Sequence, residues 1–225
     1  MLPLGLLGAA AGAESLAIIL LAAAAALPLL RSRAAGADYW EITPEQYYEK
    51  GMALLAGDGV PRDPEQAVEA FLAAAKKGHA GAQRELGVAR LTGKGADIEK
   101  HEALGWFQKA AEQGDPRSIY ELASYYSRGY GVPEDKAKAL EHVRKAAELG
   151  YPKALLELSR LLKEGGDGLD KDPKEAFALL EKAAAREDPE ALAALAEAYE
   201  NGDGTDKDLD KGGEIRRRLD GLSKS

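Results

Sequence analysis

The chain of 225 residues contains no cysteine, which excludes disulfide bonds, thiolate metal sites and cysteine nucleophiles. Aromatic residues make up only 6%, and positive charge is scarce, with 30 Lys and Arg against 38 Asp and Glu. Nonspecific nucleic-acid binding needs a basic surface, so no nucleic-acid partner is expected. Hydrophobic residues still make up 45%, enough for a folded core. The alanine-rich composition favours closely packed helices over a β-sandwich.

Charge is nearly absent from the first thirty residues, where Glu14 is the only charged side chain. As a helix, residues 10–30 would measure about 31 Å, close to the hydrocarbon thickness of a bilayer. Arg31 and Arg33 follow directly, and no Lys or Arg precedes this stretch. A signal peptide carries basic residues before its apolar core, so we predict a retained transmembrane helix with a basic flank over residues 1–33.

Three questions about this segment stay open at the level of sequence. Small residues at 34–37 offer a cleavage site, so an exported protein with a cleaved signal is the alternative. Glu14 could contact a partner helix inside the membrane, or reach the headgroups without a role. Basic residues next to a span tend to stay cytoplasmic, which predicts a single-pass cell-membrane protein with a cytoplasmic domain. A periplasmic or extracytoplasmic domain is the alternative.

After a predicted linker at residues 34–43, a repeated pattern begins. Gly-x-Gly pairs recur at steps of 36, 36, 37 and 36 residues, at Gly57/Gly59, Gly93/Gly95, Gly129/Gly131, Gly166/Gly168 and Gly202/Gly204. Each of the first four pairs is followed by an alanine, then a large apolar residue, then Ala-Ala. The large apolar residues are Phe71, Phe107, Val143 and Leu180. A small residue precedes each pair, at Gly51, Gly87, Ala123, Ser159 and Ala196. Because these positions recur at a nearly constant spacing along the chain, the sequence indicates a repeat protein.

Each unit contains signals for two helices. An Asp or Thr followed by proline starts a helix, as at Asp115-Pro116 and Asp63-Pro64. The glycine pair ends the first helix of each unit, where the backbone needs a positive φ. We therefore predict an all-α fold, a short right-handed solenoid of helix-turn-helix repeats of about 36 residues, spanning residues 44–211.

The prediction comprises about four full units and a partial capping unit. In the fifth unit Gly212 replaces the alanine and Arg216 the large apolar residue. Its second helix is therefore expected to lack an inner face, and residues 212–225 are predicted to form a polar C-terminal tail.

Particular segments carry a family resemblance. Residues 129–135 (GYGVPED), then Lys138-Ala139 and residues 144–150 (RKAAELG), resemble the Sel-one-like repeat family, as do residues 57–63 (GDGVPRD). These repeats are tetratricopeptide-related helical hairpins, and the resemblance covers roughly residues 43–204. It implies a scaffold or adaptor for protein complexes, many of which belong to membranes, secretion or signalling.

Four side chains of the first helices are candidates for binding a partner peptide or helix: Tyr48, Leu55, Arg90 and Tyr126. The alternative is that they only pack between repeats. Arg90 stands where other units have Tyr126 and Tyr199, which predicts a more polar surface in the second repeat. No motif for catalysis, a cofactor or a metal is recognisable, so we expect neither an enzyme nor a cofactor.

These observations predict a membrane-anchored scaffold or adaptor that mediates protein–protein interaction in a membrane-associated complex. Its partners would be protein subunits of that complex, and residues 10–30 would contact the membrane. One alternative is an accessory, supernumerary subunit of a multi-subunit membrane enzyme, held by the transmembrane helix. A second is an exported soluble binding module after signal cleavage.

Overall fold

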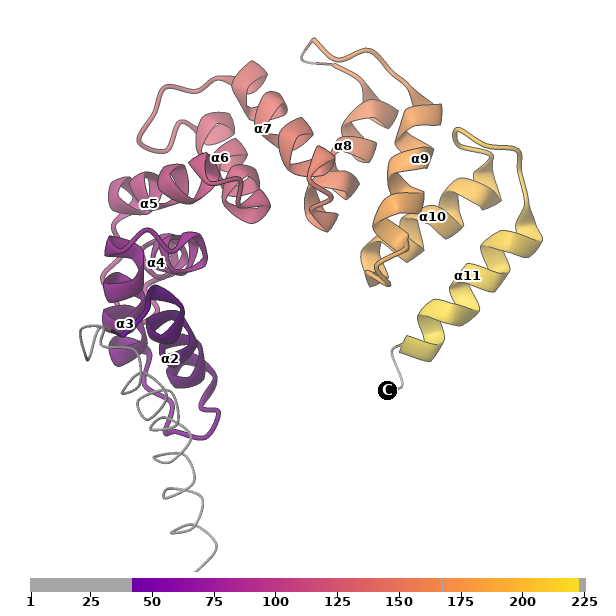
Figure 1. The fold of residues 1–225 in the computed structure, drawn as a ribbon. Helices are drawn as coiled ribbons and strands as arrows, with labels where there is room; N and C mark the ends of the chain where they lie inside the picture. The colour runs from indigo at the N-terminus through magenta and orange to yellow at the C-terminus, as the bar shows by residue number, and fades with distance from the viewer. Residues whose placement is uncertain (1–41, 167, 223–225) are drawn as a thin grey trace, which may run out of the picture. The chain divides into compact units, whose positions relative to one another are not determined.

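The computed structural model describes residues 42–166 and 168–222 and places ten α-helices within them (Figure 1). They lie in the unit Pro44–Ser225. They are α2 (Pro44–Ala56), α3 (Pro64–Lys76), α4 (Ala80–Thr92), α5 (Lys100–Glu112), α6 (Pro116–Arg128), α7 (Lys136–Glu148), α8 (Pro152–Glu164), α9 (Pro173–Ala184), α10 (Pro189–Asn201) and α11 (Leu209–Leu222). The prediction of an all-α solenoid is confirmed.

The transmembrane helix predicted for residues 1–33, with Glu14 inside it, lies outside the described residues. So does the predicted linker up to residue 41. Within the described part of the chain, every helix is too short or too polar to cross a bilayer.

Within the unit, each helix packs chiefly on its neighbours in the chain. Five hairpins form, from α2 and α3, α4 and α5, α6 and α7, α8 and α9, and α10 and α11. The second helix of each hairpin also packs on the first helix of the next. Figure 1 shows the hairpins following one another in chain order from α2 to α11. Such an array is stabilised by nearest-neighbour interfaces, because no single hairpin can bury its apolar face alone.

The helix boundaries follow the signals in the sequence. The carboxylates of Asp115 and Asp63 accept hydrogen bonds from the backbone N–H three residues on, at 2.8 and 3.0 Å. Gly93 and Gly129 end their helices in the left-handed conformation, with φ of 76° and 66°, where a side chain would be strained. The predicted caps and positive-φ stops are thereby confirmed.

In the second and fifth repeats, the second glycine of the pair allows close approach between neighbouring repeats. A Cβ atom on Gly95 would collide with the carbonyl oxygen of Pro64, the first residue of α3 in the preceding repeat. Gly204 meets Pro173 at the start of α9 in the same way. In these two repeats the loop that contains the glycine pair therefore packs on the previous hairpin.

The expectation for the C-terminus is wrong. The boundary placed between residues 211 and 212 falls inside α11, whose Ile215, Leu219 and Leu222 pack against the core. Gly212 is buried, and a Cβ there would lie 2.7 Å from the Glu200 side chain, so this glycine lets α11 approach α10 closely. Residues 212–222 are therefore the second helix of a full fifth hairpin, not a tail.

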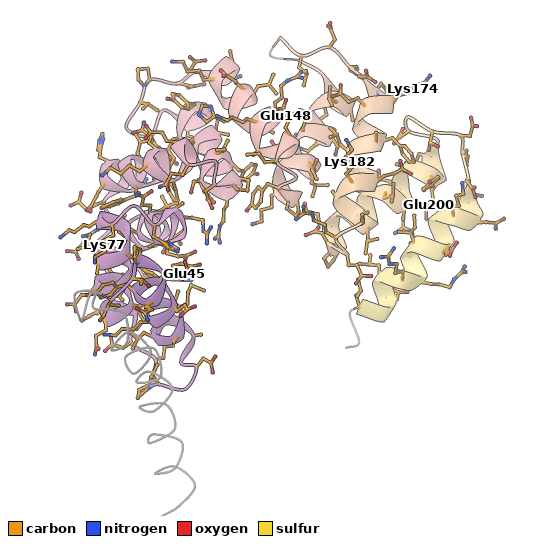
Figure 2. The ribbon with its side chains drawn as sticks, in the orientation of Figure 1. Glu45, Lys77, Glu148, Lys174, Lys182 and Glu200 are labelled. Carbon is orange, nitrogen blue, oxygen red and sulfur yellow. The ribbon has the colours of Figure 1, made fainter. Side chains whose placement is uncertain are left out.

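Polar side chains replace apolar ones at both ends of the array. Arg216 stands where earlier repeats bury Phe or Leu, and it holds Glu200 of α10 through two hydrogen bonds of 2.5 and 2.6 Å (Figure 2 labels Glu200). On α2, the exposed Lys50 stands at the position that Leu86 occupies, buried, on α4. These substitutions suit helices that meet water at the ends of a stack.

The fourth repeat contains the one-residue insertion that the step of 37 predicts. Gly165 and Gly166 both take positive φ, and Gly166 exchanges two backbone hydrogen bonds of 2.9 Å with Leu169. The extra residue is therefore accommodated in the turn between α8 and α9.

Candidate functional site

The four candidate side chains do not form a single site. Tyr48 and Leu55 of α2 are partly buried against the core of the first two repeats. Arg90 lies on α4, and Tyr126 lies on α6 against the core of the later repeats. The structure therefore distributes them over three repeats and brings only Tyr48 and Leu55 into one cluster.

Arg90 and Tyr126 occupy the seam between the two helices of their own hairpins. The Nε atom of Arg90 lies 2.9 Å from a carboxylate oxygen of Glu102 on α5, in an ion pair. The ring of Tyr126 lies 5.1 Å from the His142 ring of α7, and the Lys138 ammonium lies 5.5 Å from it. The ion pair in the second repeat thus takes the place of an aromatic contact in the third, and both contacts join helices inside a hairpin.

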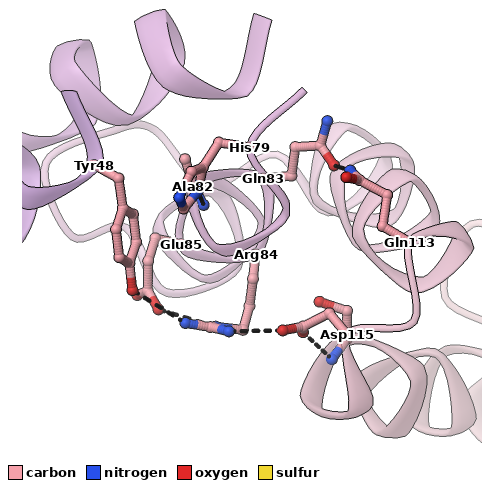
Figure 3. Close-up of polar contacts among 9 residues, drawn as sticks. Tyr48, His79, Ala82, Gln83, Arg84, Glu85, Gln113 and Asp115 are labelled. Atoms are coloured by element: carbon pink, nitrogen blue, oxygen red, sulfur yellow. Dashed lines mark hydrogen bonds and ion pairs between the residues drawn. The ribbon is translucent and has the colours of Figure 1, made fainter. Parts of the chain in front are cut away.

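Tyr48 belongs to a polar network that crosses three repeats (Figure 3). Arg84 of α4 donates to Asp115, the N-cap of α6, at 2.7 Å, and to the Tyr48 hydroxyl of α2 at 3.4 Å. A third bond of 3.1 Å joins it to Glu85. Burial alone would lower the pKa of Arg84, but the carboxylates of Asp115 and Glu85 raise it overall. The guanidinium therefore stays charged and links consecutive first helices.

His79 completes this network on the side of the first repeat. Its Nδ1 atom accepts a hydrogen bond from the Ala82 N–H at 3.0 Å and so caps α4. Because Nδ1 is an acceptor, Nε2 carries the hydrogen and donates it to Glu45, 2.8 Å away. The imidazole also stacks on Tyr48, with ring centroids 4.5 Å apart. Tyr48 is thus held by stacking and hydrogen bonding, as a structural residue.

A groove lies along the first helices of the last three repeats, at α6, α8 and α10, and is bordered by the start of α9. Its volume is about 460 Å³, within the range of sites that bind ligands or peptide side chains. Its apolar lining includes Tyr120, Leu156, Phe177, Leu180 and Ala194. A second groove of about 360 Å³ shares Tyr120, Glu157 and Arg160 with it. We call the first one the A-helix groove, because most of its lining comes from the first, or A, helices of its repeats, and it joins apolar and charged side chains on one surface.

The charged side chains of the A-helix groove are arranged in pairs. Arg160 bonds Glu157 at 2.8 Å and Glu164 at 2.9 Å. The hydrogen bond to Glu157 is the largest cause of the raised pKa of Arg160. Lys163 lies 2.7 Å from Asp203 and 3.8 Å from Glu197, and its pKa is raised chiefly by the hydrogen bond to Asp203. Each cation is therefore shared by two carboxylates.

Aromatic and acidic groups meet at one end of the groove. The rings of Tyr120 and Tyr151 lie 5.3 Å apart. Burial raises the pKa of Tyr120, and the carboxylates of Glu157, Glu121 and Glu190 raise it further. Burial also raises the pKa of Glu121, although Arg117 and Lys153 lie near enough to oppose the shift. The Tyr120 hydroxyl thus stays protonated in a negatively charged setting.

Across the described residues, no three His, Asp or Glu side chains converge as metal ligands would. The chemistry that the groove offers is apolar burial, aromatic contact and ion pairing. These are the means by which protein surfaces recognise peptide segments.

Comparison with known families identifies the repeats. The family profile of the Sel1 repeat matches residues 47–79, 80–115, 116–151, 152–188 and 189–214. The chain belongs to the Sel1 repeat family. The second, third and fourth matches each begin at a first helix and contain the whole hairpin, whereas the first begins inside α2 and the fifth ends inside α11. Sel1 repeat proteins generally mediate protein–protein interaction.

Solved structures give the same result. A Sel1 repeat protein from Oxalobacter formigenes aligns with a TM-score of 0.68 and 26% identity, over 80% of this chain and 62% of that one. A protective antigen of uropathogenic Escherichia coli that displays an SLR fold aligns with a TM-score of 0.69 and 30% identity. That alignment covers 80% of this chain and 38% of the antigen. This chain therefore spans less than two thirds of either relative. Among curated proteins, none matches.

The groove residues were missed at the level of sequence, although a signal for them exists. Positions 49, 85, 121 and 157 all hold glutamate, at steps of 36 residues. Positions 48, 84, 120 and 156 hold Tyr, Arg, Tyr and Leu, and these side chains lie on the first helices of successive repeats. A comparison of large and charged side chains at equivalent repeat positions would have pointed to Tyr120 and Glu157, which now prove to line the groove.

Proposed function

We propose that this Sel1 repeat protein is a membrane-anchored scaffold or adaptor that binds a partner protein in the A-helix groove. The observation that carries the proposal is the groove itself. It joins apolar side chains from α6, α8, α9 and α10 on one concave surface, with charged groups on its rim. Solenoids offer such surfaces because the first helices of successive repeats lie side by side.

We propose binding rather than catalysis. The charged side chains of the groove engage one another in ion pairs, and the groove lining between them is largely apolar. A surface of this kind supplies contact area and orientation for a peptide segment.

The membrane part of the proposal rests on the sequence. Residues 10–30 are long and apolar enough to span a bilayer, and Arg31 and Arg33 follow them. We propose a single-pass protein of the cell membrane with its repeats in the cytoplasm, where its partners would be subunits of a membrane complex.

Two alternatives have specific support. Glu14 within the apolar stretch favours an accessory subunit of a membrane enzyme, because an intramembrane carboxylate is usually paired with a partner's polar group. The small residues at 34–37 favour export after cleavage, as does the similarity to a protective antigen. The intact mass of the purified protein distinguishes the exported form from the two anchored ones.

Co-purification tests the proposed function. The full chain is purified in mild detergent and its bound proteins are identified by mass spectrometry. Ala194→Gln fills the groove from α10, while Ala137→Gln makes the same change at an exposed position of α7. We expect Ala194→Gln to lose a partner that Ala137→Gln and the unmodified chain retain. Retention of every partner by Ala194→Gln would contradict binding in the groove.

A further inference from the structure

The A-helix groove holds more carboxylates than its own cations can neutralise. Its lining contains four carboxylates, Glu157, Glu190, Glu197 and Asp203, and three cations, Lys153, Arg160 and Lys163. Arg160 lies 2.8 Å from Glu157, and Lys163 is shared by Asp203 and Glu197. The groove therefore has one negative charge in excess.

Glu121 of α6 follows Tyr120 directly and adds a carboxylate beside the groove. Lys153, one of the three lining cations, acts to lower the pKa of Glu121. Arg117 of α6 also lies close to Glu121, and both cations act to lower the pKa of that carboxyl, yet burial still raises it. Glu121 thus remains a poorly solvated carboxylate, which an additional cation would stabilise.

Tyr120 supplies the surface on which such a cation could rest. Its ring lines the groove 5.3 Å from the ring of Tyr151, Glu157 and Glu190 line the same groove, and Glu121 is the next residue along α6. The face of an aromatic ring attracts an ammonium or guanidinium group, and nearby carboxylates strengthen that attraction. Leu156 and Phe177 continue the apolar surface of the groove.

We propose that the groove binds a basic amphipathic segment of a protein partner. Its apolar side chains cover Leu156 and Phe177, and one Lys or Arg side chain lies against Tyr120 between Glu157 and Glu190. This inference rests on the proposed function and adds the chemistry of the partner. The net charge of the whole chain, −8, also favours the approach of a basic segment over an acidic one.

The test uses three fluorescein-labelled peptides of 12 residues, each with four copies of a triplet. The triplets are Leu-Ala-Lys, Leu-Ala-Gln and Leu-Ala-Glu, so that length and apolar content are equal and only charge differs. Binding to the full chain in nonionic detergent is followed by fluorescence anisotropy at low salt. Only the part of the anisotropy change that Ala194→Gln abolishes is counted as binding in the groove. Because both forms of the chain are measured in the same detergent, this difference also removes the signal of peptide bound to detergent.

We expect the basic peptide to bind the groove about tenfold more tightly than the neutral one, and the acidic peptide to bind least. High salt should reduce this preference, because it screens the partly exposed charges. Glu157→Gln with Glu190→Gln should abolish the preference while leaving the neutral peptide unaffected. Glu69→Gln with Glu141→Gln removes the same charge from exposed positions of α3 and α7 and should leave the preference intact.

The outcomes separate this inference from the proposed function. Equal binding of basic and neutral peptides in the groove would overturn the inference and leave partner binding in place. The inference would also be overturned if the basic peptide showed no groove-dependent binding. It would equally be overturned if the preference for the basic peptide survived Glu157→Gln with Glu190→Gln. Co-purification with Ala194→Gln judges the proposed function independently of all three peptides.

Discussion

The distance between the two helices of a hairpin depends on the sizes of two side chains that face each other. A Cβ atom on Gly51 would lie 2.5 Å from the Phe71 ring, and one on Gly87 would lie 2.7 Å from the Phe107 ring. Later repeats hold Ala123 and Ser159 at the same first-helix position, where the second helix holds the smaller Val143 and Leu180. Small first-helix residues and large second-helix residues thus vary together, so that each hairpin stays closely packed.

Gly87→Ala tests this packing. Alanine favours a helix by about 0.5–1 kcal/mol over glycine, but the collision with Phe107 should cost about 1–3 kcal/mol. We expect a net loss of about 1–2 kcal/mol in the free energy of unfolding by urea. Gly105→Ala is the matched control, because no atom beyond the adjoining residues and backbone of α5 lies within 4 Å of its Cβ position. It should stabilise the protein, and Phe107→Leu should rescue Gly87→Ala. A stabilising Gly87→Ala would show that the two helices are not in close contact.

The contacts of individual polar residues are the feature that the sequence predicted least well. The departure of Arg90 from the tyrosine pattern was visible, but its partner Glu102 lies on the other helix of the hairpin. Whether a side chain points into a seam or onto a free surface depends on how the two helices are rotated relative to each other. Spacing alone defines the apolar face of a helix and leaves its flanks ambiguous. Tyr48 and Tyr126 lie on such flanks.

Between elements, Arg84 forms a polar link that is largely buried. It joins α4 to Asp115 at the start of α6, and the two side chains are only 19% and 11% exposed. Arg84→Met keeps the length of the side chain but leaves Asp115 and Tyr48 without their partner. We expect a loss of about 1–3 kcal/mol in unfolding free energy. Arg217→Met, an exposed change on α11, should lie within about 0.5 kcal/mol of the unmodified protein. Equal effects from the two would show that the network contributes no net stability.

The last helix shows where a repeat pattern can mislead. The equivalents of the buried Ala and Phe positions in α11 are Gly212 and Arg216, which indicated a helix without an inner face. Ile215, Leu219 and Leu222 supply that face instead, at helical spacing of their own. Caps and stops depend on one residue and its immediate neighbours, and these were predicted correctly. Packing depends on the partner helix, which the repeat register describes only on average.

Truncation after Asp208 tests the role of α11. Removing it should expose the side of α10 on which Gly212 and Leu219 pack and so unfold part of the fifth repeat. We expect a fall in far-UV helical signal larger than α11 alone accounts for, and faster hydrogen exchange in α10. Truncation after Leu222 is the control and should change neither measurement. Unchanged exchange in α10 would mean that α11 is dispensable to the array.

At the scale of the whole molecule, the length of the repeats and the first four hairpins could be predicted from the sequence, but the full fifth hairpin and the groove could not. Its lining comes from four helices, with Tyr120 and Glu190 on either side of α8 and seventy residues apart in the chain. The repeat spacing predicts that these side chains occupy related positions, but it does not predict how strongly the array curves. Curvature follows from small rotations between hairpins, and it determines whether neighbouring first helices enclose a groove.

The proposed side of the membrane for the array rests on the charges that surround the predicted span. Arg31 and Arg33 come directly after the predicted span and Lys50 comes soon after, while the residues before it contain no Lys or Arg. Basic residues near a span resist translocation, and the many acidic residues of the array count for little in this respect. Residues 1–9 contain no charged side chain, so the transfer of these residues across the membrane costs little free energy. We therefore expect the N-terminus outside and the repeats in the cytoplasm.

Reporters fused after Ser225, one active only in the cytoplasm and one only outside, measure this orientation directly. Arg31→Glu with Arg33→Glu should weaken the preference for the cytoplasm. Activity of the exported reporter alone would reverse the orientation, and the basic partner segment would then have to be sought outside the cytoplasm.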